Sequence, residues 1–304
     1  MKATETNLNR FLAQNDTQFV IPVYQRNYDW TIAHCKQLID DILLVGCDNK
    51  ISTHFIGSIV FIHDDVYSSS GIRELTIIDG QQRVTTVTLL YIVLLKIAIR
   101  NENKQLVSRI NETFLINKFA ESEKLKLRPT ENNDQALKFL LNNHDENQTF
   151  SEYSRLIENF DYLTTRINEH NIEIVQKGLD KLMFVEISLE RDKDDPQRIF
   201  ESLNSTGLDL SQADLIRNYI LMGLKHQHQV KIYENYWQPI ENLCTVKETN
   251  ENRVSDFIRD FLTIENRDIP NKSKVYQEFK SKYKFGNDLK LLEKILTKIR
   301  KYAN

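Results

Sequence analysis

The sequence is short of cysteine, glycine and proline, and each shortage excludes a class of protein. The three cysteines, Cys35, Cys47 and Cys244, are odd in number and form no CxxC pair, which argues against a disulfide framework or a zinc knuckle. With only 8 glycines and 5 prolines, and with aliphatic residues recurring at three- and four-residue spacings, we expect helix to dominate over sheet. Hydrophobic and charged contents of 40% and 27% are typical of a globular chain.

Several catalytic motifs are also missing from the 304 residues. The chain has no GxxxxGK[ST] phosphate loop, no GxSxG turn and no HExxH helix, so a P-loop NTPase, a serine hydrolase and a zinc protease are not supported. The histidines are scattered, and the pair His226 and His228 lacks the i,i+4 spacing of a helical metal site. Only His54 stays a candidate neighbour of a site. Any nucleotide site must therefore follow another design.

The chain shows no excess of positive charge and no long hydrophobic run. A net charge of −3 and a pI near 6.2 give no whole-chain attraction to nucleic acid, so contact with DNA would need a local patch. The N-terminus lacks a secretory core, and the most apolar segment, residues 87–95, is too short to span a bilayer. We expect a cytoplasmic protein that does not enter a membrane.

The pattern along the chain predicts an α+β fold. We expect a small mixed sheet, a helical insertion over about 101–178 and an all-helical C-terminal part. The expected elements, in chain order, are a short helix at 5–14, a strand near 19–21, a helix capped by Thr31 and ending near Gly46, a strand hairpin at 54–63 and 73–78 with a bulge or close approach at Gly57, a helix from the turn at 79–80 through Arg100, a short strand at 124–128, a strand at 182–190, and helices after Pro196 and Ser211.

The segment Asp79-Gly80-Gln81-Gln82-Arg83 joins a buried strand to a long helix, and this arrangement predicts an anion site. The free N–H groups and positive dipole end of the helix favour a phosphate, Arg83 can grip it, and Asp79 can hold a magnesium ion. Gln81 or Gln82 can orient an attacking water, as glutamines do in some nucleotide hydrolases. The alternative is that Asp79 caps the helix while Arg83 forms a surface ion pair.

Two further segments are candidate binding elements. In YQRNYDW, residues 24–30, Arg26 lies among large aromatic side chains, which either stack on a base and hold a phosphate or form an amphipathic corner against the core. In FESLNSTGLDLSQADLIRNYI, residues 200–220, Asn204-Ser205-Thr206-Gly207 makes a polar turn. Asp214, Arg217 and Asn218 then share one helical face, which suits either a ligand or an intrahelical ion pair.

Taken together, IPVYQRNYDW, HFIGSIV, IDGQQRVTT and FESLNSTGLDLSQADLIRNYI, in this order, resemble the N-terminal domain of GmrSD-type modification-dependent restriction endonucleases. The resemblance spans most of residues 19–220. It implies a fold similar to the ParB and sulfiredoxin superfamily, a nucleotide site at residues 79–83, and NTP hydrolysis coupled to restriction. Arg26, Asn204 and Arg217 fall in the other motifs. We expect a nucleotide-binding domain over residues 1–225 and a helical region over 226–304.

The leading hypothesis is a magnesium-dependent NTPase that regulates a nuclease in a DNA restriction or phage-defence system, with GTP, ATP or CTP as its nucleotide. The expected catalytic residues are Asp79, Gln81, Gln82 and Arg83, of which Asp79 would also bind the metal. The expected nucleotide-binding residues are Tyr24, Gln25, Arg26, Gly80, Thr85, Asn204, Thr206, Gly207, Asp214 and Arg217. Because full-length members commonly carry an HNH-type nuclease domain and none follows here, we expect no DNA cleavage by this chain. DNA contact would come through a partner or through the missing nuclease domain, and a homo-oligomer is compatible with the sequence.

Two alternatives stay open at this point. The first is a DNA-binding module that hydrolyses no nucleotide and reads modified bases with Tyr24, Tyr28, Trp30 and a local basic patch, so that its binding would weaken steeply with salt. The second is a structural adaptor whose C-terminal helices bind a partner.

Overall fold

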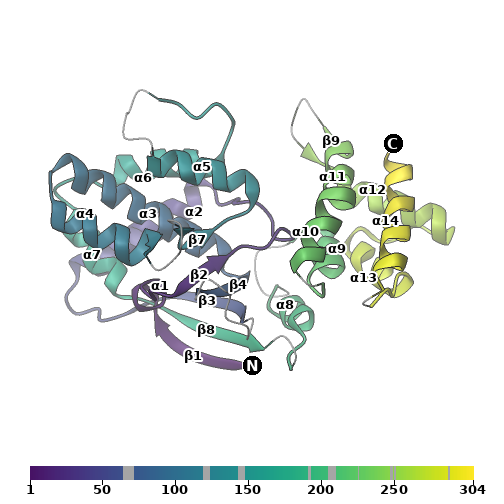
Figure 1. Ribbon diagram of the computed structural model, residues 1–304, viewed down its shortest axis with the longest axis horizontal. Helices are drawn as coiled ribbons and strands as arrows, with labels where there is room; N and C mark the ends of the chain where they lie inside the picture. The colour runs from purple at the N-terminus through teal and green to yellow at the C-terminus, as the bar shows by residue number, and fades with distance from the viewer. Residues whose placement is uncertain are drawn as a thin grey trace. The chain divides into compact units, whose positions relative to one another are not determined.

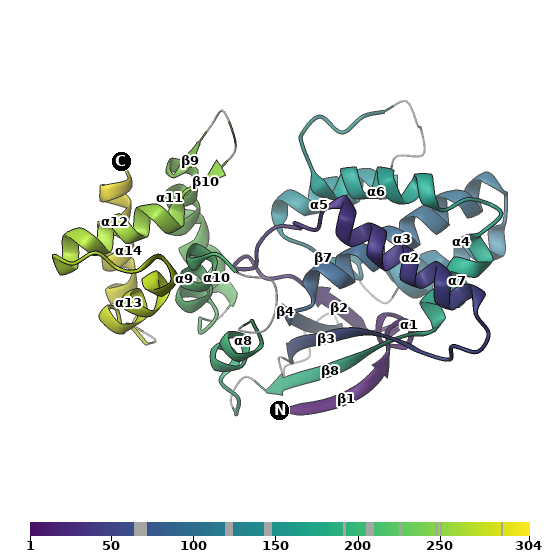
Figure 2. The same ribbon diagram turned by 180° about the vertical axis from the view of Figure 1, so that it is seen from behind.

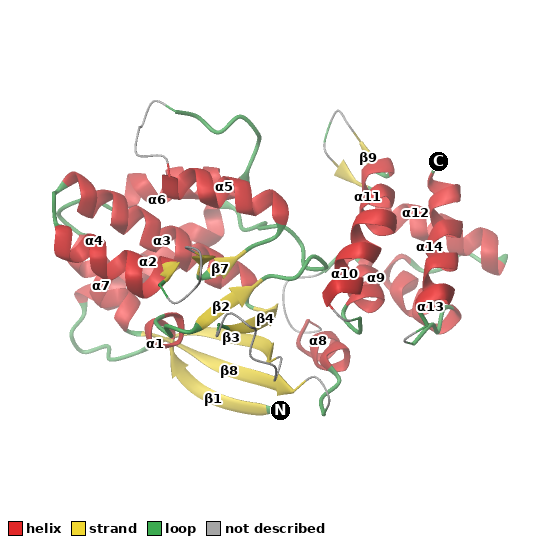
Figure 3. Ribbon diagram, in the orientation of Figure 1, coloured by secondary structure: helices red, strands yellow, loops and turns green. Residues whose placement is uncertain are grey.

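The computed structural model describes residues 1–63, 72–118, 124–142, 148–190, 193–204, 210–224, 226–246, 249, 251–286 and 288–304. The chain forms two compact units, of which the first comprises residues 1–22 and 27–194 and the second residues 23–26 and 195–304. The first unit contains a sheet and its covering helices. The second is built from helices and one short strand pair (Figure 3).

The first unit is a six-stranded mixed sheet with a layer of helices over one face (Figure 1). Along the sheet the strand order is β1-β8-β3-β4-β2-β7. Strands β3 and β4 pair antiparallel, as expected for a hairpin, while β3 is parallel to β8 and β4 is parallel to β2. Because parallel and antiparallel neighbours occur in one sheet, the expected α+β class is confirmed.

The element bounds of the first unit are β1 (Lys2–Asn7), α1 (Leu8–Leu12), β2 (Thr17–Val20), α2 (Ile32–Cys47), β3 (His54–His63), β4 (Arg73–Asp79), α3 (Gln81–Arg100), α4 (Lys104–Ile110), a π-helical turn η1 (Asn111–Leu115), β5 (Ile116–Asn117), β6 (Lys124–Leu125), β7 (Leu127–Arg128), α5 (Glu131–Asn142), α6 (Arg155–Arg166), α7 (Ile172–Asp180) and β8 (Leu182–Glu190). Strands β5 and β6 form a separate antiparallel pair.

Helix α3 is the centre of the hydrophobic core. Its residues are buried almost all round, from Gln81 and Gln82 at the start to Ala98 near the end. By length and composition alone this helix is apolar enough to cross a membrane, but 83% of its apolar window is buried inside the protein. A helix that is hydrophobic on every side and buried on every side is typical of a protein interior.

Helices α2 and α7 cross with their backbones in contact, because each contributes a glycine at the crossing point. A Cβ atom on Gly178 would lie 2.1 Å from the carbonyl oxygen of Ile42, and one on Gly46 would lie 2.1 Å from that of Ile174. No side chain fits at such a distance. These two glycines therefore set how closely the two helices pack.

One expectation for the first unit is corrected. The helix expected at 5–14 is shorter, since residues 2–7 form the edge strand β1, which pairs antiparallel with β8; this long-range pairing overrides the local helical preference. The segment 101–178 is mainly helical, and the short strand expected at 124–128 is present as β6 and β7, of which β7 joins the main sheet. The apolar faces of α6 and α7, with Leu163 and Val175 fully buried, complete the same core.

The second unit packs several short helices around its own interior (Figure 2). Its elements are α8 (Pro196–Asn204), α9 (Gln212–Leu221), α10 (His226–Ile232), a π-helical turn η2 (Tyr233–Trp237), α11 (Gln238–Leu243), β9 (Thr245–Val246), β10 (Glu251–Asn252), α12 (Val254–Asn266), a 3-10 turn η3 (Lys272–Lys274), α13 (Val275–Lys282) and α14 (Leu289–Ala303). The short antiparallel pair of β9 and β10 was not expected from the helical periodicity of this region.

The division between the units lies after Asp194, which differs from the domain boundary expected at residue 225. Helix α9 belongs by its contacts to the second unit. The backbone N–H of Ala213 donates to the Ser255 hydroxyl of α12 at 3.0 Å, and the Gln212 side chain accepts from the backbone N–H of Tyr276 on α13 at 2.8 Å.

The glycine crossing gives a stability prediction. Replacing Gly178 with alanine should lower the free energy of unfolding by about 1–3 kcal/mol, the usual cost of forcing an extra methyl group into a packed core. Gly223→Ala is the matched control, because no atom lies within 4 Å of the place that its methyl group would take and its backbone is not left-handed. Urea denaturation of both variants measures the difference, and equal midpoints would contradict the packing assigned to Gly178.

Candidate functional site

The turn from β4 into α3 requires glycine. Gly80 is the N-cap residue of α3 and has a φ of 89°, a left-handed conformation that side chains rarely adopt. Its position is also crowded, since a Cβ atom there would lie 2.9 Å from Cγ1 of Ile59 and 3.0 Å from the carbonyl oxygen of Ser58. The start of helix α3 is therefore pressed against strand β3.

The Arg83 side chain of α3 contacts the same part of strand β3. Its Nη1 donates to the Ser58 carbonyl at 2.7 Å, and a Cβ atom on Gly57 would lie only 3.0 Å from Nη2. Gly57 has a φ of 103°, and the pairing of β3 with β8 shifts register between Phe55 and Ser58. The bulge and the close approach expected at Gly57 are both confirmed, and the approaching group is the Arg83 guanidinium.

Asp79 does not cap the helix. The N-cap position belongs to Gly80, which offers no side-chain hydrogen bond, and the first turn closes with the backbone N–H of Val84 donating to the Gly80 carbonyl at 3.1 Å. Among the described residues, none forms a hydrogen bond or ion pair with the half-buried Asp79 carboxylate. The capped-helix alternative, with Arg83 in a surface ion pair, is therefore wrong for both residues.

Gln82 uses its whole side-chain amide to hold the loop before α2. Its Oε1 accepts from the backbone N–H groups of Asp29 at 2.9 Å and Trp30 at 3.2 Å, and its Nε2 donates to the Asn27 carbonyl at 3.3 Å. In this conformation the side chain orients protein backbone. Gln81 beside it and Thr85 one turn on are also buried.

The loop of residues 27–30 is also held by a second residue of α3 and by helix α6 of the first unit. The Tyr28 hydroxyl lies 2.8 Å from Oγ1 of Thr86 on α3, and Asn159 of α6 donates to it at 3.3 Å and to the Trp30 carbonyl at 2.5 Å. Burial raises the pKa of Tyr28 far above its ordinary value, with a further contribution from Cys35 nearby. This tyrosine is a neutral structural hydrogen-bonding group.

Burial of the other residues in this motif favours the amphipathic corner over base stacking. Tyr24 and Tyr28 are 1% and 6% exposed, Gln25 is buried, and Arg26 is half-buried. Stacking on a base needs an open aromatic face. This conformation offers none at Tyr24 or Tyr28, so the DNA-reading alternative finds no support in these two tyrosines.

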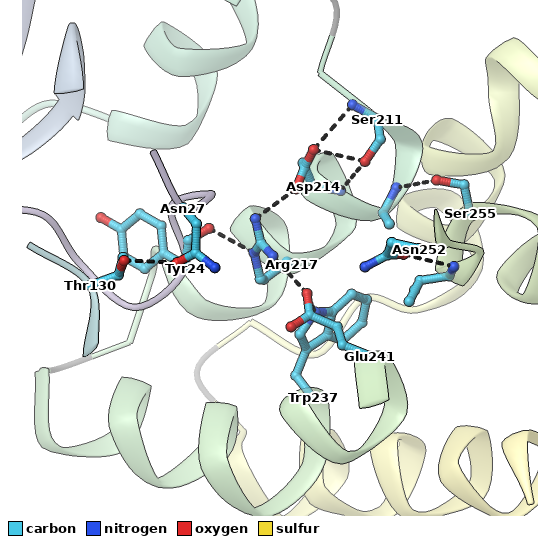
Figure 4. Close-up of polar contacts among 12 residues, drawn as sticks. Tyr24, Asn27, Thr130, Ser211, Asp214, Arg217, Trp237, Glu241, Asn252 and Ser255 are labelled. Atoms are coloured by element: carbon cyan, nitrogen blue, oxygen red, sulfur yellow. Dashed lines mark hydrogen bonds and ion pairs between the residues drawn. The ribbon is translucent and has the colours of Figure 1, made fainter. Parts of the chain in front are cut away.

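Arg217 is fully committed to protein partners in the second unit (Figure 4). Its Nε donates to the Tyr24 carbonyl at 2.8 Å, Nη1 to Glu241 at 2.6 Å and Nη2 to Asp214 at 2.6 Å. Burial alone would lower the pKa of Arg217, but the carboxylates of Asp214 and Glu241 raise it above the ordinary value. The intrahelical ion pair, rather than an open ligand face, is what α9 presents at these positions.

The remaining candidates of the third motif are only partly described. Asn204 is the last residue of α8, and its side chain, like Thr206 and Gly207, lies outside the described part of the structure. Ser211 caps α9, and its hydroxyl accepts from the Asp214 backbone N–H at 3.1 Å. His54 lies 3.5 Å from Asp41 of α2.

No pre-formed metal cage occurs among the described residues. Groups of three or more His, Cys, Asp or Glu side chains that could hold a metal ion are absent from those ranges. A magnesium ion held by Asp79 would therefore have fewer than three such side chains among the described residues and would depend on ligand oxygens and water for its other positions, which is how magnesium is often bound beside phosphates.

The order of these motifs along the chain matches one protein family. The model of the GmrSD restriction endonuclease N-terminal domain aligns with residues 8–221. The chain belongs to this family. No curated protein matches it. As a GmrSD domain, the chain is a component of a restriction system, and its matched region includes both the β4–α3 turn and helix α9.

Some partners of the GmrSD motifs were not found from the sequence. Ser58 acts through its backbone carbonyl, so its side chain gives no signal. Asn159 is a fully buried amide on the apolar face of α6, a pattern that marks a structural hydrogen bond. Glu241 lies beyond the matched residues, and its role with Arg217 emerges only from the three-dimensional contacts.

Arg217 gives a stability prediction within the GmrSD domain. Arg217→Ala should lower the free energy of unfolding by about 3–5 kcal/mol, because it leaves the partly buried Asp214 and Glu241 charges unpaired. The matched control is Arg253→Ala, which removes an exposed ion pair with Glu251 and should cost about 1 kcal/mol or less. Denaturant midpoints measure both, and similar small losses would show that the network contributes little.

Proposed function

We propose that the β4–α3 turn, residues 79–83, binds the phosphates of a nucleoside triphosphate with magnesium, and that hydrolysis of this nucleotide regulates a nuclease of the restriction system. The observation that carries the proposal is that, among the described residues, the Arg83 guanidinium has one hydrogen-bond partner and the Asp79 carboxylate has none. Both lie at the start of a 20-residue helix. Such a helix end attracts anions through its free N–H groups and its dipole.

Arg83 is held in place but keeps hydrogen-bonding capacity. Nη1 is fixed by the Ser58 carbonyl, whereas Nε and Nη2 have no protein partner among the described residues. An arginine that is anchored by one donor and open at the others loses little side-chain entropy when it grips a phosphate. This contrasts with Arg217, whose three nitrogen groups are all occupied.

Asp79 would supply the metal ligand. Asp79 is the last residue of β4, where it pairs with Val60 of β3, and only Gly80 separates it from the first residue of α3. Asp79 would hold the magnesium ion, and the ion would supply positive charge that offsets the negative charge of the phosphates. GTP, ATP and CTP share the phosphates and magnesium that this turn would contact.

Gln82 would couple the site to the rest of the domain rather than orient a water directly. Its backbone lies in the first turn of α3, while its amide holds the loop of residues 27–30. A shift of the helix start on phosphate binding would therefore act on that loop. Gln81, rather than Gln82, is therefore the glutamine that we propose positions an attacking water.

The nucleotide proposal is tested by substitution at the turn. Arg83→Ala should weaken binding of nucleotide with magnesium by about 10-fold or more, the effect of losing a charge-assisted contact of about 1.5–3 kcal/mol. Asp79→Asn should reduce the magnesium dependence of binding. Isothermal titration with each NTP measures affinity, and phosphate release measures hydrolysis.

Arg100→Ala, at the opposite end of the same helix, is the matched control and should bind nucleotide as the unmodified chain does. If the unmodified chain and Arg83→Ala were equally inactive and neither bound any NTP, the proposed function would be excluded. Binding without phosphate release would limit the role of the turn to nucleotide sensing.

A further inference from the structure

Positive charge is concentrated at the C-terminal end of the second unit. Residues 267–304 contain 11 Lys and Arg against 4 Asp and Glu, although the whole chain has a net charge of −3. The rest of the chain is therefore strongly acidic. A basic segment on an acidic protein indicates a local binding surface for an anionic partner rather than a general property of the molecule.

Helix α14 arranges part of this charge as a stripe. Four lysines at positions 290, 294, 298 and 301 recur at spacings of four and three residues, so they share one face of the helix. All four are exposed. At a rise of about 1.5 Å per residue, the stripe is about 16 Å long. We refer to Lys290, Lys294, Lys298 and Lys301 as the α14 lysine stripe.

Most of the stripe is available for a partner. Lys298 pairs with Glu265 of α12 at 2.6 Å, but no ion pair or hydrogen bond engages the side chains of Lys290, Lys294 and Lys301 within the described part of the chain. The acidic residue on a neighbouring position of the helix, Glu293, is already paired with Lys231 at 3.0 Å. The unneutralised lysines therefore define the charge of this face.

The opposite face of α14 is buried. Leu292, Leu296 and Ile299 are 1%, 0% and 0% exposed, and the helix packs them onto α11, α12 and the η2 turn of the same unit. A basic amphipathic helix that binds a membrane must insert its apolar face between lipids. Here Leu292, Leu296 and Ile299 are buried in the protein and cannot insert between lipids, so charge is the main property that the stripe offers to a partner.

We propose that the α14 lysine stripe binds the phosphate backbone of duplex DNA without reading sequence. A duplex carries about one negative charge per 1.7 Å of axis, a dense line of charge that a row of lysines about 16 Å long complements. The family to which the chain belongs consists of restriction endonucleases, which act on DNA. This surface would hold the domain on DNA independently of the nucleotide site, and it goes beyond the function proposed above.

The test uses the full chain and a fluorescent duplex of mixed sequence, with binding measured by anisotropy over a series of salt concentrations. The unmodified chain should bind with a Kd of about 10⁻⁴–10⁻⁶ M and lose affinity as salt rises. The triple variant Lys290→Ala, Lys294→Ala and Lys301→Ala should bind more weakly, with the slope of log K against log salt reduced by about 2.7.

The matched control removes three exposed lysines from the first unit, at positions 2, 104 and 177, and should leave both affinity and slope unchanged. Circular dichroism and thermal melting of both triple variants should match the unmodified chain, because the substituted side chains lie on the surface. Arg83→Ala should bind DNA normally, which separates this result from failure of the nucleotide proposal.

Three outcomes would overturn the proposal. The unmodified chain could fail to bind duplex, the two triple variants could lose affinity equally, or the chain could bind vesicles of anionic lipid while ignoring the duplex. The last result would assign the stripe to a membrane surface instead.

Discussion

The contact between strand β3 and the start of helix α3 is the constraint on which the candidate site depends. Two glycines make it possible, since Gly57 leaves room for the Arg83 guanidinium and Gly80 lets the chain turn against Ser58 and Ile59. Both have left-handed backbones, which costs other residues of order 1–3 kcal/mol. This contact fixes the position of the start of α3, anchors Arg83, and places Gln82 beside the loop that begins at Asn27. The HFIGSIV and IDGQQRVTT motifs, which are separate in the sequence, thus form one structural element.

The two arginines of the family motifs have different roles, and the difference follows from what surrounds them. Arg217 is 7% exposed and donates hydrogen bonds to two carboxylates and a carbonyl. Its positive charge is therefore neutralised by partners inside the protein. Arg83 meets one carbonyl and keeps donors for a ligand. Buried arginines with complete partners stabilise a fold, whereas partly engaged ones are suited to recognition. The nucleotide proposal therefore rests on the first unit alone.

Much of the fold could be predicted from the sequence because its signals are local. The apolar, β-branched strand of residues 54–63, the turn at Gly80 and the long helix that follows it all depend on short-range patterns. What could not be predicted depends on distant partners: β1 forms because β8 offers an edge, and Gln82 is occupied because the loop at Asp29 reaches it. The position of Arg83 in the first turn of α3 could be predicted from the sequence, whereas the engagement of Arg217 inside the protein depends on Glu241, which lies 24 residues further on.

The most direct test of the account is hydrogen exchange of the backbone amides with and without nucleotide and magnesium. Phosphate binding at the β4–α3 turn predicts slower exchange at the N–H groups of residues 81–83, because these amides would donate to phosphate oxygens. Exchange in α14 should not change. Protection elsewhere in the chain, with the amides of residues 81–83 unaffected by a nucleotide that binds, would contradict the central claim.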